Sequence, residues 1–111
     1  VRATAFSVTA LPAETTFDAI KDVFLILNNF DIPKGFSREV VKGEIYADYT
    51  QLTCARDPQT LKYYYKTYNN QTVKEFDLNS FDSNSKEILV LNTDASKQVF
   101  ENVNKKLKPT K

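Results

Sequence analysis

Residues 49–78, YTQLTCARDPQTLKYYYKTYNNQTVKEFDL, hold most of the structural information in this sequence, because turn-like stretches alternate in them with β-rich runs. The runs extend over residues 44–56, 61–68 and 72–78. The intervening stretches, Asp57 to Thr60 and Asn69 to Gln71, consist of residue types that favour turns. Strands joined by short connections are usually neighbours, so the sequence predicts a three-stranded antiparallel meander.

The tyrosines indicate how this meander is packed. All six lie between positions 46 and 68, and Tyr63, Tyr64 and Tyr65 are consecutive. Successive side chains of a strand point to opposite faces, so the middle strand is predicted to be covered on both sides. The rings either pack across neighbouring strands or form a stacking platform for a sugar or a nucleic acid. The pattern favours packing.

A helix is predicted before the meander, over residues 17–29. Thr15 and Asp18 have the spacing of a capping box. A wide apolar stripe follows at helical spacing, which is typical of a helix that packs on a sheet; it consists of Phe17, Ile20, Val23, Phe24, Leu27 and Phe30. A loop is expected from Asp31 to Gly43.

The two ends of the chain complete the predicted α+β fold, an antiparallel sheet with packed helices. Residues 1–10 alternate like a strand, with Arg2 sharing a face with Phe6 and Val8. If Arg2 is buried, its guanidinium needs partners, since leaving a buried charge unpaired costs about 3–5 kcal/mol. The alternative is that Arg2, near the end of the strand, reaches water. Residues 86–91, KEILVL, predict a last strand. Residues 94–108 predict a helix. Residues 1–111 then form a single domain or the C-terminal fragment of a larger protein.

Composition excludes several classes of function. The 111 residues carry 15 basic and 14 acidic side chains, and this net charge of +1 argues against general nucleic-acid binding. No apolar run approaches the ~20 residues that span a bilayer. Histidine is absent, which removes histidine-based catalysis and most zinc sites. Gly35 and Gly43 are the only glycines, so there is no glycine-rich phosphate loop. No cofactor or metal is predicted.

Two further residues have both a structural and a functional interpretation. Cys54 is either a small buried apolar residue or a nucleophile with Arg56 on the same strand face, and the first is favoured because the chain has no histidine to act as a base. Asn70-Gln71-Thr72 matches the glycosylation acceptor pattern. Such triplets arise often by chance, so it carries little weight.

Three segments resemble, in order and spacing, the C-terminal portion of the choloylglycine hydrolase family, which contains conjugated bile salt hydrolases and penicillin V acylases. Residues 1–6, VRATAF, are similar to the family's Phe-Val-Arg-x-Ala-Phe segment. Residues 23–35, VFLILNNFDIPKG, are similar to its helix ending in Ile-Leu-Asn before a Pro-Gly loop.

The third segment, residues 49–82, is the most specific. Residues 49–53, YTQLT, resemble the family's Tyr-Thr-Gln-Trp-Thr, with Leu52 in place of tryptophan, and Asp57 follows four residues on. Tyr63-Tyr64 and the Thr67–Asn70 turn match the family's Tyr-Tyr and Thr-Tyr-x-Asn. The turn before these motifs, residues 57–61, departs from the family's pattern. The resemblance extends to about Leu91.

This resemblance implies a fold, a reaction and one site residue. The fold is the four-layer αββα sandwich of N-terminal nucleophile hydrolases, of which this chain would be the C-terminal portion. The nucleophile is an N-terminal cysteine whose own α-amino group is the base; Cys54 is not that cysteine. Arg2 matches the family's active-site arginine, where a guanidinium lowers the pKa of a thiol and stabilises developing negative charge.

The implied function is cleavage of linear, non-peptide amides such as conjugated bile salts or penicillin V, with this chain inactive alone. The implied partners are a small-molecule N-acyl amide substrate, the remainder of the hydrolase chain and, in a homotetramer, further copies. Family members occur in the cytoplasm and in the periplasm. The alternative is a stand-alone α+β binding or scaffold module with an aromatic sheet face.

Overall fold

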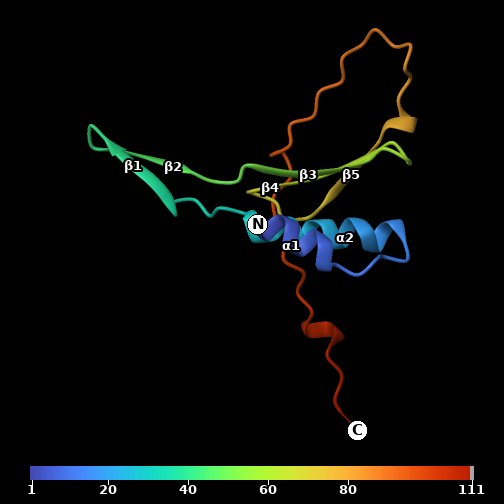
Figure 1. The fold of residues 1–111 in the computed structure, drawn as a ribbon, viewed down its shortest axis with the longest axis horizontal. Coiled ribbons are helices and arrows are strands. Elements are labelled where there is room, and N and C mark those ends of the chain that lie inside the picture. Colours follow the sequence, from blue (N-terminus) through green and yellow to red (C-terminus); the bar gives the residue numbers. More distant parts are fainter. Residues whose placement is uncertain (111) are drawn as a thin grey trace.

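Two α-helices and two antiparallel sheets with five strands make up the regular structure of residues 1–110, the part of the chain that the computed structural model describes (Figure 1). The predicted α+β class is confirmed. The elements in chain order are α1 Arg2–Thr9, α2 Thr16–Leu27, β1 Ser37–Val41, β2 Glu44–Asp48, β3 Leu52–Asp57, β4 Lys62–Thr67 and β5 Lys74–Asp77. Three short 3₁₀ turns cover Asn28–Phe30, Leu78–Ser80 and Asn104–Lys106.

The predicted meander is confirmed as an antiparallel sheet in the order β3-β4-β5. Its middle strand, β4, has Tyr64 on the face that α2 covers and Tyr65 on the opposite face. Both rings are buried, with 8% and 4% of their surface exposed. Tyr64 therefore packs against α2 and Tyr65 against Phe76 of the neighbouring strand, which confirms the prediction that the rings serve packing.

The face of this sheet that points away from α2, called the outer face below, carries an aromatic cluster. The ring of Phe76 on β5 stacks on Tyr65, with centroids 5.5 Å apart, and lies 6.5 Å from the ring of Tyr63. The ammonium of Lys74 lies 5.6 Å from the centroid of Tyr65. Adjacent strands thus place their rings in one continuous row.

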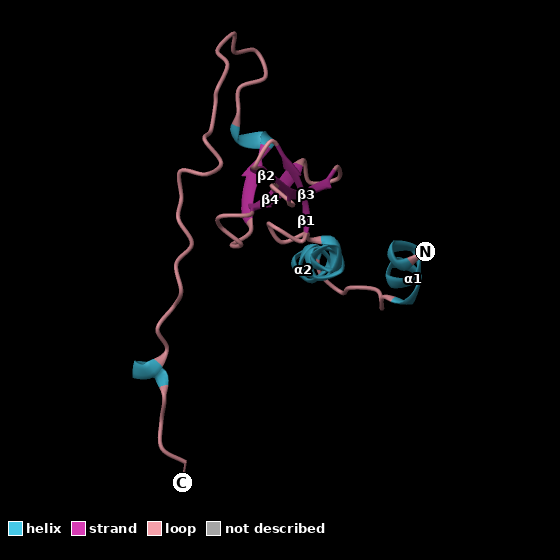
Figure 2. Cartoon of the chain, turned by 90° about the vertical axis from the view of Figure 1, so that its left-hand side faces the viewer, coloured by secondary structure: helices cyan, strands magenta, loops and turns pink. Residues whose placement is uncertain are grey.

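Helix α2 begins where its capping box predicts. The Thr15 hydroxyl accepts a hydrogen bond from the Asp18 amide at 3.1 Å and donates to the Asp18 carboxylate at 2.7 Å. The helix ends at Leu27, two residues before the predicted end, because the backbone tightens into the 3₁₀ turn. Phe24 is its buried anchor, only 5% exposed, and both ribbon views show the helix along one face of the β3-β4-β5 sheet (Figures 1 and 2).

Two predictions for residues 31–56 were wrong in part: the loop from Asp31 to Gly43 and the single strand over residues 44–56. Strand β1 lies within the predicted loop and pairs with β2 in a hairpin, called the arm below. Its two-residue turn, Lys42-Gly43, has both φ angles positive, +52° and +85°, as such hairpin turns require. Lysine is unusual at a position with positive φ, which concealed the turn. Strand pairing stops between Asp48 and Leu52, so the predicted long strand is two strands.

The base of the arm is fixed to the sheet by local bonds. The Ile32 amide donates to the Thr50 hydroxyl at 2.8 Å, and the Thr50 amide donates to the Ile32 carbonyl at 3.0 Å. The Tyr68 hydroxyl accepts from the Lys34 amide at 3.2 Å, and its ring meets Tyr49 edge-on with centroids 4.8 Å apart. The YT and TY pairs of the sequence motifs therefore orient the arm away from the body (Figure 1).

The predicted first strand was wrong, since residues 2–9 form helix α1. The hydroxyls of Ser7 and Thr9 donate to the carbonyls of Ala3 and Ala5, four residues earlier, so these polar groups are satisfied locally. Within residues 1–110 no strand lies beside this segment to pair with it. Arg2 consequently does not share a strand face with Val8.

The predictions for residues 86–91 and 94–108 were also wrong. The first segment is extended without strand pairing, and the second contains only the 3₁₀ turn at Asn104–Lys106. The amide groups of Asn92 and Asn102 accept hydrogen bonds from the backbone two residues on, and such bonds compete with a helix.

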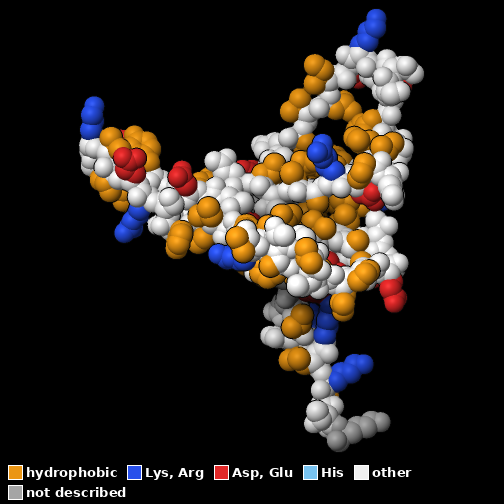
Figure 3. All heavy atoms as spheres, in the orientation of Figure 1, with side chains coloured by type: hydrophobic (Ala, Val, Ile, Leu, Met, Phe, Trp, Pro, Cys, Tyr) orange, Lys and Arg blue, Asp and Glu red, His pale blue; other side chains and the backbone are white. Residues whose placement is uncertain are grey.

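Much apolar surface stays uncovered. The radius of gyration is 18.7 Å, against about 13 Å for a compact chain of this length. Among the described residues, the buried hydrophobic side chains are Phe24, Tyr64 and Tyr65 alone, and apolar side chains are scattered over the arm and the body in Figure 3. In residues 1–110, neither α-helix is long and apolar enough to cross a membrane.

The capping box gives a direct test of how α2 begins. Replacing Thr15 with alanine removes the acceptor of the Asp18 amide and is expected to lower the free energy of unfolding by about 1 kcal/mol. Urea unfolding followed by circular dichroism measures this. Thr16→Ala, one position into the helix, is the matched control and should have a much smaller effect; equal losses would contradict the capping role.

Candidate functional site

Arg2, the predicted site residue, is exposed near the start of α1. No ion pair or hydrogen bond to its guanidinium occurs within the part of the chain described. One helical turn further on, Phe6 is half-buried. The side chain therefore has its full set of donors available for a partner outside these residues.

Cys54 is exposed, so the prediction of a buried side chain was wrong. It lies on β3, an edge strand, and its side chain points to the open outer face beside Tyr65. A hydrogen bond with the Cys54 thiol raises the pKa of the Tyr63 hydroxyl, and burial raises it further. Its backbone nitrogen lies within a peptide bond, so the residue lacks the free amine of an N-terminal nucleophile.

The most tightly bound polar group lies on the opposite face of the sheet, at Lys66. Its side chain is 6% exposed. The ammonium donates three hydrogen bonds, to Asn28 Oδ1 at 2.5 Å, Asp31 Oδ2 at 2.5 Å and Gln71 Oε1 at 3.0 Å. An ammonium has three donors, so all of them are satisfied.

The groups around Lys66 are satisfied as well. The second carboxylate oxygen of Asp31 accepts from the Thr53 hydroxyl at 3.1 Å. The Gln71 amide nitrogen donates to the carbonyls of Thr67 at 3.0 Å and Tyr68 at 3.2 Å. One ammonium thereby joins the end of α2, the root of the arm, β4 and the β4–β5 turn. The small cavity beside it, about 250 Å³, is walled by groups that already have partners.

Sequence reasoning missed this cluster, although a signal for it exists. Lys66 shares its strand face with the buried Tyr64, and a charged residue there needs an acidic partner. Asn28 and Asp31, two polar residues close to the predicted helix end, are the partners it uses. The relation is not apparent in one dimension because 35 residues separate the two charges.

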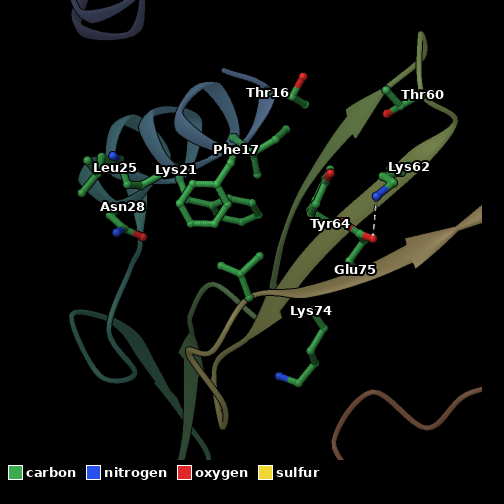
Figure 4. Close-up of a pocket in the computed structure, with 13 residues that line it drawn as sticks. Thr16, Phe17, Lys21, Leu25, Asn28, Thr60, Lys62, Tyr64, Lys74 and Glu75 are labelled. Atoms are coloured by element: carbon green, nitrogen blue, oxygen red, sulfur yellow. Dashed lines mark hydrogen bonds and ion pairs between the residues drawn. The ribbon is translucent and has the colours of Figure 1, made fainter. Parts of the chain in front are cut away.

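A groove of about 680 Å³ separates α2 from β4 and β5 (Figure 4). Phe17 extends from the helix toward the sheet but remains 78% exposed. On the sheet side, the Lys62 ammonium pairs with the Glu75 carboxylate at 3.0 Å. Burial raises the pKa of the Tyr64 hydroxyl, which a hydrogen bond with Glu75 raises further. The groove is chiefly apolar, so it lacks the convergent reactive groups of a catalytic centre.

The chemistry available in this chain is therefore narrow. Residues 1–110 contain no group of three or more metal-ligating side chains. Asn70, the glycosylation acceptor of the sequence pattern, is 5% exposed, and its amide donates to the carbonyl and hydroxyl of Ser96 at 3.1 Å each. The donors of Arg2 are uncommitted, as are those of Arg38 and Arg56, so the match to the family's arginine is what distinguishes Arg2.

Comparison with protein families gives one finding. The family model for linear amide C–N hydrolases, choloylglycine hydrolase family, matches residues 1–91. The matched range includes α1, α2, the arm, the whole β3-β4-β5 sheet and the Lys66 cluster.

The Lys66 cluster predicts a large difference between two lysines on one strand face. Lys66→Met leaves the Asp31 carboxylate without its buried cation and is expected to lower the free energy of unfolding by about 2–3 kcal/mol. Lys62→Met removes a more exposed, solvent-screened pair and should cost far less. Chemical denaturation of both variants makes the comparison, and similar losses would show that the cluster does not hold the fold together.

Burial of Tyr64 predicts a loss of stability in alkali. Its pKa is raised in the folded chain above the ordinary 10.0, so both states are neutral below that value and stability is complete there. As the pH rises past 10.0 the unfolded chain ionises first, and the free energy of unfolding falls. Thermal unfolding up to about pH 11 tests this. Tyr64→Phe should flatten the fall, whereas Tyr46→Phe on the arm should not.

Proposed function

Because this chain belongs to the choloylglycine hydrolase family of linear amide C–N hydrolases, we propose that it is the C-terminal part of an enzyme that cleaves non-peptide amides. The family match over residues 1–91 is the observation that carries this proposal. The substrate class is a small-molecule N-acyl amide, with conjugated bile salts and penicillin V as the candidates. The nucleophile is an N-terminal cysteine supplied by the remainder of the hydrolase chain.

The proposed reaction has two steps. The cysteine thiolate attacks the amide carbonyl, its proton having passed to the α-amino group. The C–N bond breaks as the C–S bond forms, and the amine leaves with that proton. Water then attacks the thioester, which releases the carboxylic acid and restores the thiol. Because the first step needs a free N-terminal amine, Cys54 takes no part in it.

Arg2 is proposed to stand beside the reactive sulfur. Its uncommitted guanidinium favours the thiolate over the thiol and stabilises the negative charge that develops on the carbonyl oxygen. A guanidinium can also hold a carboxylate in a bidentate bond. The support is its match to the family's arginine and the absence of any competing partner within residues 1–110.

The open outer face supports the proposal that further layers cover this chain. Tyr63 and Phe76 stand half-buried in a row on a sheet whose other face is covered by α2, and apolar side chains that remain partly exposed together mark contact sites. In an αββα sandwich a second sheet packs on such a face. Assembly into a homotetramer is proposed on the family resemblance alone.

The aromatic row also supports a second candidate, a stand-alone binding module. Its half-buried rings, Tyr63 and Phe76, suit a flat ligand. The two candidates differ in solution behaviour. A stand-alone module is monomeric and unfolds cooperatively, whereas part of a sandwich self-associates through its uncovered face.

The test of the proposed function substitutes Arg2 in the hydrolase that carries the N-terminal cysteine. Arg2→Ala should lower kcat by about 100-fold or more, as loss of one charge-stabilising donor does elsewhere, and should raise the pKa read from the pH dependence of kcat/KM. Arg2→Lys should recover part of the rate.

Arg38→Ala, which removes an exposed arginine of the arm, is the matched control and should leave turnover unchanged. Release of the amine from penicillin V and from a conjugated bile salt is measured for each variant. The 111-residue chain alone should release none. Near-normal turnover of Arg2→Ala would remove Arg2 from the site.

A further inference from the structure

The segment from residue 86 to residue 91, called the strap below, leaves an apolar run in water. The exposed fractions of Ile88, Leu89, Val90 and Leu91 are 89%, 70%, 89% and 53%. The backbone amides of residues 88–91 make no hydrogen bond within residues 1–110. Four consecutive apolar side chains with free backbone groups are typical of a segment that is covered when in use.

The strap faces the cavity that would receive it. A cavity of about 700 Å³ lies between the strap and the outer face. It is bounded on the sheet side by Tyr63, Phe76 and Leu78 and on the strap side by Leu89, Val90 and Leu91. The side chains that face each other across it are therefore apolar, while polar groups such as Asp82 and Glu87 border it as well. Tyr65 and Cys54 do not border this cavity, so it occupies only the end of the outer face near Leu78.

Both ends of the strap are anchored close to this cavity. Before it, the Ser85 amide donates to the Asp82 carbonyl at 3.1 Å, and the Glu87 amide donates to the Ser85 hydroxyl at 3.1 Å. After it, Ser96 is bonded to Asn70 in the β4–β5 turn. Anchoring at both ends restricts the strap to the neighbourhood of the sheet, which lowers the entropy cost of closure. Figure 1 shows this segment returning from its outermost bend to the sheet.

We infer that the strap closes on the outer face, with Leu89 and Leu91 entering the cavity between Tyr63 and Phe76. Ile88 is the one residue of the apolar run that does not border the cavity, so Ile88 stays in water. Closure covers the end of the aromatic row with a segment of the same chain. This conformational device goes beyond the proposed function, and because the cavity occupies only the end of the outer face near Leu78, closure leaves the part of that face around Tyr65 and Cys54 free for a further layer.

Thiol reactivity tests the closure without depending on stability. In a Cys54→Ser background, single cysteines are placed by Leu89→Cys and Ile88→Cys, and their reaction with a maleimide is timed. A strap that is closed most of the time should make Leu89→Cys react about tenfold more slowly than Ile88→Cys, since only the open state reacts. If the strap stays open, both positions are largely exposed and the two cysteines react with the maleimide at similar rates. Similar rates would therefore overturn the proposal.

Two further measurements identify what covers Leu89→Cys. Adding Leu78→Ser should speed its reaction, since Leu78 borders the cavity; Leu52→Ser, an exposed leucine on β3 outside the cavity, is the control and should not. Protection that increases with protein concentration would assign the cover to a second copy and overturn the proposal. Protection independent of concentration and lost with Leu78→Ser supports it.

Discussion

The ammonium of Lys66 is the interaction on which the described structure depends. It is 6% exposed and has three acceptors from two separate segments, Asn28 and Asp31 after α2 and Gln71 in the β4–β5 turn. Without it, α2 would rest on the sheet chiefly through Phe24, since Phe17 remains exposed. A buried charge of this kind tolerates few arrangements, because every donor must find its acceptor. The Lys66 ammonium therefore fixes the position of the end of α2 on the sheet, because the apolar core is too small to do so.

This fixed frame explains how a chain with little chemistry of its own serves a hydrolase. One face of the central sheet is occupied by α2, and the other presents Tyr63, Tyr65 and Phe76 in a row. The family to which the chain belongs acts on linear amide bonds. In the proposed enzyme this part contributes Arg2 and a rigid layer against which the remaining layers pack, while the reactive thiol comes from elsewhere.

Local patterns predicted the centre of the fold well, and long-range pairing determined the rest. The meander, the Thr15 cap and the packing of Tyr64 were all apparent from turn residues and spacing. Residues 1–10 and 86–91 have strand-like sequences but no neighbouring strand, and a strand exists only when paired. Lys66 and Asp31 were missed because their contact joins positions 35 residues apart. The place of Arg2 in a site rests on resemblance, since its proposed partner lies outside this chain.

The central claim is that an N-terminal cysteine of a larger protein, and not Cys54, attacks the amide. The most direct measurement is to quench the complete hydrolase during turnover of penicillin V and to locate the acyl group by peptide mass spectrometry. The account predicts one acyl group as a thioester on the N-terminal cysteine and none on the peptide that contains Cys54. Acylation of Cys54, or turnover with no acyl-enzyme on the N-terminal cysteine at any time, would contradict it.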